Sequence, residues 1–251
     1  MWAHDRHQRI LAMLDARGQV GAQNLADLLG VSRETIRRDL LDLDRAGRVR
    51  RVHGGAVLPE AAPEAPFANR MTTHLRAKRE IARKAVGLIG PGQCVMIDAG
   101  STTAIFAQEL ARLSGITVIT NSLAVANTVQ GAGGGIDLLL LGGRMFADVP
   151  ATFGELTLSE IARFRADLAF VAPVAVDLDG AHDFALHEAE VARAMSGRAG
   201  RVAVLADRSK LGRASRVRCI ETGRIGALVT DGGADAGFLA GLRGRGIEVI
   251  A

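Results

Sequence analysis

Apolar residues near the amino terminus recur at helical spacing in three short segments. The first segment carries Ile10, Leu11 and Leu14, the second Leu25, Leu28 and Leu29, and the third Ile36, Leu40 and Leu43. Each set places its side chains on one face of a helix. Gly30, a residue favoured at helix C-termini, closes the second segment. We therefore expect three short helices that share one small core.

The third segment has a start signal and two distinct faces. Ser32 stands just before it, and a serine hydroxyl can accept a hydrogen bond from a free backbone N–H in the first helical turn. Glu34, Thr35 and Arg38 project from the side opposite the apolar stripe. This helix is predicted to have a buried apolar face and an exposed polar face, which we call the presenting face because its side chains are available to a partner.

A basic hairpin is predicted directly after the three helices. In residues 49–58, apolar and basic residues flank Gly54 and Gly55, a pair that favours a tight turn between two strands. Three short helices followed by a basic hairpin are typical of a winged helix-turn-helix. The third helix would read DNA, and the hairpin would be the wing.

Arginine suits DNA recognition because its planar fork pairs with guanine O6 and N7, or with phosphate oxygens. Arg37 and Arg38 are the best candidates for base contacts, and the hairpin residues are expected to contact phosphates. The full candidate set is Ser32, Arg33, Thr35, Arg37, Arg38, Arg50, Arg51 and His53. The alternative is a solvated helix face on which the arginines pair with Asp39, Asp42 or Asp44. The cap, stripe, preceding helix and hairpin together favour DNA binding.

The segment from Arg6 to Leu40 resembles the DeoR-type winged helix-turn-helix signature of bacterial transcription regulators. Arg6, Ile10 and Leu14 follow one another at four-residue intervals, and seventeen residues then lead to Ser32. The hexapeptide TIRRDL at residues 35–40 follows, and residues 47–58 match the family's wing.

Residues beyond the hairpin form most of this 251-residue chain. Pro59, Pro63 and Pro66 lie in Ala- and Glu-rich sequence and cannot continue a helix or a central strand, so they indicate a connector. We expect a DNA-binding domain at 1–58, a linker at 59–73 and an α/β effector-binding domain at 74–251. Six buried-strand runs alternate with helical patterns, at residues 95–97, 116–119, 138–141, 168–171, 202–205 and 227–230. Such alternation predicts a mostly parallel sheet.

The loops after these strands carry groups suited to an anionic, polyhydroxylated metabolite, because ligands of such sheets bind outside the carboxyl ends of the strands. Glycine allows close approach, hydroxyls donate hydrogen bonds, and a following helix offers free N–H groups to an anion. The candidate effector contacts are Asp98, Gly100, Ser101, Thr102, Thr103, Asn121, Ser122, Gly142, Gly143, Arg144 and Lys210. Alternatively, the hydroxyl residues cap helices and Lys210 is a surface charge.

These loops also resemble the family's sensor motifs, in the strings DAGSTT, TNSL, LGGR and ADRSK. The resemblance implies a domain similar in fold to ribose-phosphate isomerases, which binds a phosphorylated sugar or polyol and thereby weakens operator binding. It implies neither catalysis nor a cofactor. The chain departs from the family pattern at residues 171–187, where Pro173 and valines replace flexible residues.

Other functions receive less support from the residues. His182, Asp183, His187 and Glu188 are of types that bind Zn²⁺, but a polar loop that caps a helix at Glu188 is the favoured interpretation, and no metal is expected. An isomerase-like enzyme with a DNA-binding appendage would use Asp98, Glu190 and Lys210 as acid–base groups. A DNA binder with a degenerate sensor is a further alternative.

Charge and cysteine content agree with a cytoplasmic transcription repressor. The first 58 residues hold ten arginines against seven acidic residues, so the basic excess concentrates in the predicted DNA-binding part. Cys94 and Cys219 stand singly, as in a reduced protein, and no apolar run approaches the ~18 residues of a membrane span. The expected partners are a double-stranded DNA operator and the effector. A homodimer or homotetramer is expected, since a two-fold operator needs two readers.

Overall fold

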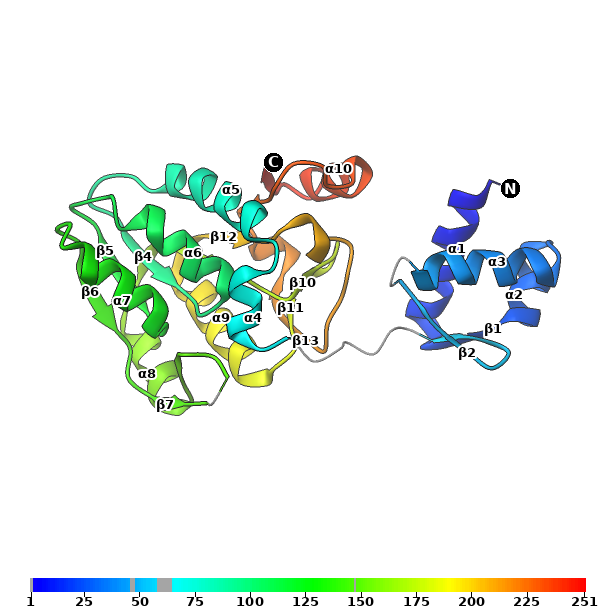
Figure 1. The fold of residues 1–251 in the computed structure, drawn as a ribbon, viewed down its shortest axis with the longest axis horizontal. Helices are drawn as coiled ribbons and strands as arrows, with labels where there is room; N and C mark the ends of the chain where they lie inside the picture. Colours follow the sequence, from blue (N-terminus) through cyan, green and yellow to red (C-terminus); the bar gives the residue numbers. More distant parts are fainter. Residues whose placement is uncertain (1, 46–47, 58–64, 147) are drawn as a thin grey trace. The chain divides into compact units, whose positions relative to one another are not determined.

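The computed structural model describes residues 2–45, 48–57, 65–146 and 148–251 (Figure 1). The chain divides into two compact units, Met1–Ala62 and Pro63–Ala251. Of the predicted connector, Pro59 and Pro63 lie outside the described residues, and residues 67–72 form a helix of the second unit. The domain limits at 58 and 74 stay predictions.

The first unit contains the three predicted helices and the hairpin. Its elements are α1 (Ala3–Arg17), β1 (Gln19–Gly21), α2 (Ala22–Leu29), α3 (Arg33–Arg45), β2 (Arg50–Val52) and β3 (Gly55–Val57). The strands form an antiparallel sheet in the order β1-β3-β2, and β1 was not predicted. Ile10, Leu14 and Ile36 are fully buried in the shared core. Leu28 was wrongly assigned to that core, since 59% of it is exposed.

A seven-stranded parallel sheet forms the centre of the second unit, in the order β15-β14-β12-β9-β4-β5-β6. The strands are β4 (Cys94–Ile97), β5 (Thr117–Thr120), β6 (Asp137–Leu140), β9 (Ala166–Val171), β12 (Ala199–Leu205), β14 (Ala227–Val229) and β15 (Glu248–Ile250). All six predicted runs are strands of this sheet, which confirms the predicted α/β fold, and β15 is an addition at one edge.

Helices cover both faces of the sheet. They are α5 (Leu75–Ala85), α6 (Ser101–Leu110) and α7 (Leu123–Ala132) on one face, and α8 (Glu155–Arg163), α9 (Leu186–Arg198) and α10 (Ala236–Arg243) on the other. Alternate side chains of one strand point to the two faces of the sheet: Val95 and Ile97 pack with α5–α7, whereas Met96 packs with α8 and α9. A doubly covered sheet explains why its strands read as apolar runs rather than alternating ones.

Short elements complete the second unit. They are α4 (Phe67–Thr72), β7 (Arg144–Met145), β8 (Thr152–Phe153), β10 (Ala175–Val176), β11 (Gly180–Asp183), β13 (Val217–Glu221), and the 3₁₀ turns η1 (Val86–Leu88), η2 (Arg208–Lys210) and η3 (Thr222–Arg224). The atypical 171–187 segment runs from the end of β9 through the antiparallel pair β10–β11 to the start of α9. It is therefore an ordered hairpin that leads toward the ends of the central strands.

The strand order reverses between β4 and β9, and this is where doubly wound sheets bind ligands. Asp98 directly follows β4, and Ala172 directly follows β9. The Ala172 N–H donates a hydrogen bond of 2.9 Å to Asp98 Oδ2. The Asp98 carboxylate therefore connects the ends of β4 and β9, the two strands between which the strand order reverses.

Candidate DNA interface and effector pocket

Ser32 caps α3 as its position predicts. Its Oγ accepts a hydrogen bond of 3.1 Å from the Thr35 N–H and lies 2.8 Å from Thr35 Oγ1. Both hydroxyls are therefore held at the amino end of α3, where free N–H groups favour an anion such as a phosphate.

Several predicted DNA contacts surround one cavity between α3 and the β2–β3 hairpin. The cavity is lined by Ala22, Arg33, Glu34, Arg37, Leu40, Arg51, Val52, Gly54 and Gly55. Three of the candidate arginines therefore share one concave surface. Arg38, with 74% of its side chain exposed, does not line this cavity.

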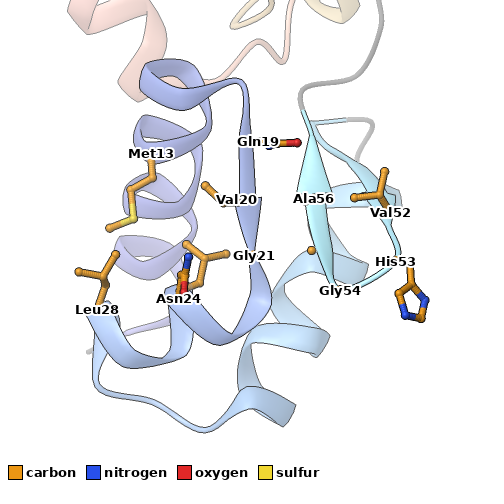
Figure 2. A pocket seen from close by; sticks show the side chains of 12 residues that line it. Met13, Gln19, Val20, Gly21, Asn24, Leu28, Val52, His53, Gly54 and Ala56 are labelled. Carbon is orange, nitrogen blue, oxygen red and sulfur yellow. The ribbon is translucent and has the colours of Figure 1, made fainter.

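His53 occupies the turn of the hairpin together with Gly54, whose φ of +83° suits a glycine. Figure 2 shows the His53 ring pointing away from the body of the unit. The same view shows a second hollow, bordered by Met13 of α1 and Leu28 of α2 as well as by the hairpin. The exposed Leu28 thus belongs to the wall of this hollow rather than to the core.

Glu34 forms the ion pairs of the presenting face. Arg37 donates through Nε and Nη2 to the two Glu34 carboxylate oxygens, both at 2.8 Å, and Arg38 Nε lies 3.4 Å from Oε1. Chiefly through the bond from Arg37, these contacts lower the pKa of Glu34 to about 2. Glu34, which was not predicted as a site residue, is thus the partner of these arginines in place of the expected Asp39, Asp42 or Asp44. The spacing of three and four residues was the signal for the actual pairing.

Asp39 instead anchors α3 to α1. It is 4% exposed, and Arg6 donates to it through Nε at 2.5 Å and Nη2 at 2.8 Å. His7 Nε2 lies 3.1 Å from the same carboxylate. A nearly buried carboxylate needs such partners, so this cluster fixes the orientation of α3 within the unit.

Asp98 lies at the centre of a small pocket in the second unit. The lining consists of Arg70, Asp98, Ala99, Asn121, Phe153, Ala172, Asp183, Glu188 and Val191. Burial raises the pKa of Asp98 to about 7, with a further rise from Glu188, while the Ala172 N–H and Lys210 act in the opposite direction. Asp98 Oδ1 and Asn121 Oδ1 are both buried without a hydrogen-bond partner among the described residues. These two oxygens are therefore available to accept hydrogen bonds from a ligand in this pocket.

The hydroxyl residues at the start of α6 form the neighbouring part of the candidate site. Ser101 Oγ accepts a hydrogen bond of 2.9 Å from the buried Lys78 ammonium, and Thr103 Oγ1 donates to Gly100 O. Thr102 Oγ1 is buried and lacks a hydrogen-bond partner within the described parts of the chain. Gly100 is the N-cap of α6 and no side chain caps this helix, so its first N–H groups remain available to an anion.

The other predicted effector contacts are distributed more widely. Ser122 caps α7 by accepting from the Val125 N–H at 3.3 Å, and Lys210 Nζ donates to Pro173 O at 2.6 Å. Gly142 contacts α8 through its N–H to Glu160 and its carbonyl to Thr157. The exposed Arg144 lies over the Phe146 ring. Of the predicted effector contacts, Asp98 and Asn121 line the pocket and the others do not.

Arg70, Phe153, Asp183 and Glu188 line the pocket, and sequence reasoning did not assign them to the effector. Asp183 ends β11 and is 6% exposed, and Glu188 lies in the first turn of α9. The expected cap at Glu188 is wrong, because Ala185 is the N-cap of α9 and contributes no side-chain bond. Within the described residues, no three His, Cys, Asp or Glu side chains are arranged to share a metal ion.

Comparison with known proteins places both units in one family. The DeoR-like helix-turn-helix domain matches residues 6–62, and the DeoR C terminal sensor domain matches residues 73–232. The chain belongs to the DeoR family. It is 33% identical over 227 residues to the glycerol-3-phosphate regulon repressor of Escherichia coli (strain K12), covering 90% of each chain. It is 31% identical to the HTH-type transcriptional repressor GlcR of Bacillus subtilis (strain 168), covering all of this chain and 96% of that one.

Solved structures similar to this DeoR-family chain include the ribose 5-phosphate isomerase A of Methanocaldococcus jannaschii. That match has a TM-score of 0.38 and 20% identity, and it covers 53% of each chain. The DeoR-family assignment makes this protein a DNA-binding transcription regulator. In the described part of the chain, no helix combines the length and apolar character needed to cross a membrane.

Proposed function

We propose that this DeoR-family regulator is a repressor that releases its operator when a phosphorylated sugar or polyol binds the second unit. The observation that carries the proposal is the pocket at the strand reversal, in which Asp98 Oδ1 and Asn121 Oδ1 lack donors. Hydroxyl groups of a polyol supply such donors. The glycerol-3-phosphate regulon repressor, a relative over nearly the whole chain, is named for a polyol phosphate, which agrees with this ligand class.

The two ends of such an effector have complementary surroundings. Asp183 and Glu188 favour the hydroxylated end, because carboxylates accept hydrogen bonds and repel a phosphate, and Asp98 has an oxygen that accepts a hydrogen bond in either protonation state. The free N–H groups of α6 at Ser101 and Thr102, with the Lys210 ammonium, favour the phosphate. We infer that the effector lies with its phosphate toward α6 and its hydroxyls toward Asp98.

Binding rather than turnover is the proposed task of these groups. The relatives described above are transcription regulators, and a repressor needs the same side chains only to hold its ligand. We propose a cytoplasmic homo-oligomer, either dimer or tetramer, that uses no cofactor. The free thiols of Cys94 and Cys219 and the need to reach DNA support this location.

The proposal is tested with Ser101→Ala and Lys210→Met in the full chain, with Ser159→Ala on the exposed face of α8 as the control. Operator affinity without effector should stay within about twofold of the wild type for all three. The sugar-phosphate concentration that releases half of the operator should rise at least ~10-fold for the first two variants only. Ser101→Ala removes the hydroxyl that can donate to the phosphate beside the N–H groups of α6, and Lys210→Met removes the ammonium, each a contact worth over ~1.4 kcal/mol. Unchanged release by both would contradict the assigned pocket.

A further inference from the structure

Glu34 is an unexpected residue on a surface that is predicted to face DNA phosphates. Of the described residues that line the cavity between α3 and the hairpin, it is the one acid, and it stands among Arg33, Arg37 and Arg51. A carboxylate at a protein–DNA interface is repelled by phosphates and by the acceptor groups of base edges. Glu34 therefore weakens DNA binding in general unless it performs a specific task.

Stability of the fold is an insufficient reason for this residue. The side chains of Glu34 and Arg37 are 52% and 54% exposed, and ion pairs in such positions contribute little to stability. The buried partner that fixes α3 is Asp39, which binds Arg6 on α1. Glu34 is thus available for recognition.

The geometry of the pair leaves part of the Arg37 fork for DNA. Glu34 accepts from Nε and Nη2, which form one edge of the guanidinium group. Arginine carries five N–H donors, so the edge formed by Nη1 and the second Nη2 hydrogen remains for a base. That edge matches guanine O6 and N7 in the major groove. A carboxylate bound to the first edge limits the directions in which the second edge can point.

We propose that Glu34 is a specificity-determining residue that positions Arg37 for one guanine and disfavours sequences that cannot pair with the oriented fork. Without Glu34, Arg37 has more rotamers and can bind phosphates at any sequence. The carboxylate thus reduces affinity for arbitrary DNA and increases discrimination at one base pair per half-site. This inference rests on the placement of α3 against DNA.

The test selects bound sequences from a random duplex library with the full-length wild type and with Glu34→Ala, Arg37→Ala, the double variant and Asp42→Asn. Asp42 is an exposed carboxylate on the same helix, so its variant controls for the loss of one charge. We expect Glu34→Ala to lower the guanine preference at one position by ~5- to ~100-fold, the range of a bidentate base contact. Its affinity for a random-sequence duplex should rise several-fold.

Coupling to Arg37 distinguishes positioning from a simple charge effect. The double variant should lose no more guanine preference than Arg37→Ala alone, and Asp42→Asn should keep the wild-type preference while it binds all sequences slightly more tightly. Glu34→Gln preserves the side-chain length and should also lower the guanine preference. It replaces Glu34→Ala in the test if the alanine variant has a lower melting temperature than the wild type.

Two negative results have different meanings. If the wild type enriches a motif and Glu34→Ala enriches the same motif with equal preference, the role given to Glu34 is wrong and the DNA-reading helix stands. If the wild type enriches no motif, the assignment of α3 to base reading fails together with this inference.

Discussion

Asp98 is a carboxyl group that the fold almost completely removes from water. Its carboxylate is 7% exposed, and burial is the main reason that its pKa rises to about 7. The charged groups around it are Glu188 on α9, Asp183 on β11, Arg70 on α4 and Lys210 on η2. The folded protein therefore retains a proton on Asp98 at pH values at which the unfolded chain releases it.

The sign of the resulting pH dependence follows from linkage. Because the folded pKa lies above the ordinary aspartate value of 3.8, ionisation of Asp98 destabilises the fold progressively as the pH rises from about 4 to about 7. Asp98→Asn removes this effect and should raise the free energy of unfolding at pH 8, by on the order of 1–4 kcal/mol. The gain should shrink toward pH 5. Urea unfolding at both pH values measures it, with Asp137→Asn on exposed β6 as the control; equal gains at both pH values would contradict the explanation.

Sequence reasoning identified the residues whose role depends on local chain geometry. Ser32 precedes an apolar stripe and caps α3, and Asp98 follows a strand and lies at the strand reversal. Asp183 and Glu188 were not assigned to the effector because their approach to Asp98 depends on the β10–β11 hairpin, a tertiary arrangement without a local pattern. Asp39 was interpreted as a surface charge because its partner, Arg6, lies 33 residues away.

At the scale of elements, α4 connects the candidate pocket with the segment that leads to the DNA-binding unit. Lys78 Nζ donates both to Arg70 O and to Ser101 Oγ, so the carboxyl half of α4 is tied to the predicted phosphate loop. Asp148 accepts from the Phe67 N–H at 3.2 Å and lies 3.7 Å from Arg70. We expect an effector that binds at Ser101 to change the surroundings of α4, which lies within the segment predicted as the linker.

This arrangement predicts that Asp148→Asn weakens the coupling between effector binding and operator binding while the protein still binds the effector. The ratio of operator affinities without and with saturating effector, commonly ~5- to ~150-fold in allosteric proteins, should fall several-fold. The effector affinity of the DNA-free protein should change by less than about threefold. Fluorescence anisotropy of labelled operator and calorimetry of the effector measure the two quantities. An unchanged ratio, or equal loss in Asp137→Asn, would exclude α4 as the route.

Elements with strong patterns were predictable, and short ones were not. The six strand runs are apolar because both faces of the sheet are covered, and the three helices of the first unit show clear periodicity. Helix α4 has six residues and follows Pro66, and its one apolar pair at helical spacing, Phe67 and Met71, is too short a pattern to predict a helix. Strands β7 and β8 have two residues each, which is too short for any periodicity.

Over the whole molecule, exposed apolar side chains gather on and after the edge strand β6. Leu139 and Leu140 are 38% and 46% exposed, and the following β7 and α8 expose Met145 and Leu156. Leu139 lies beside Ile119 on the face covered by α8, and Leu140 points to the opposite face, so both sides of this edge strand expose a leucine. An edge strand with exposed leucines favours pairing with another chain, and a regulator of two-fold operators needs a second copy.

We therefore expect Leu140→Glu to weaken self-association. The wild type should sediment as a dimer or tetramer, and the variant should shift toward monomer and bind a two-fold operator at least ~10-fold more weakly, because two linked readers raise the effective concentration of the second. Sedimentation velocity measures the change, and Leu186→Glu on α9 is the control with a similarly exposed leucine. An unaltered sedimentation coefficient for Leu140→Glu would place the interface elsewhere.

The central claim is that one chain couples operator binding to a phosphorylated sugar or polyol. Its most direct test measures the dissociation constant of the full-length protein for DNA from its own upstream region, with and without a panel of sugar and polyol phosphates, at one stated salt concentration. We predict specific binding that one class of these compounds weakens by ~5- to ~150-fold, while the matching unphosphorylated sugars have no effect. Specific binding that none of the compounds alters would contradict the account.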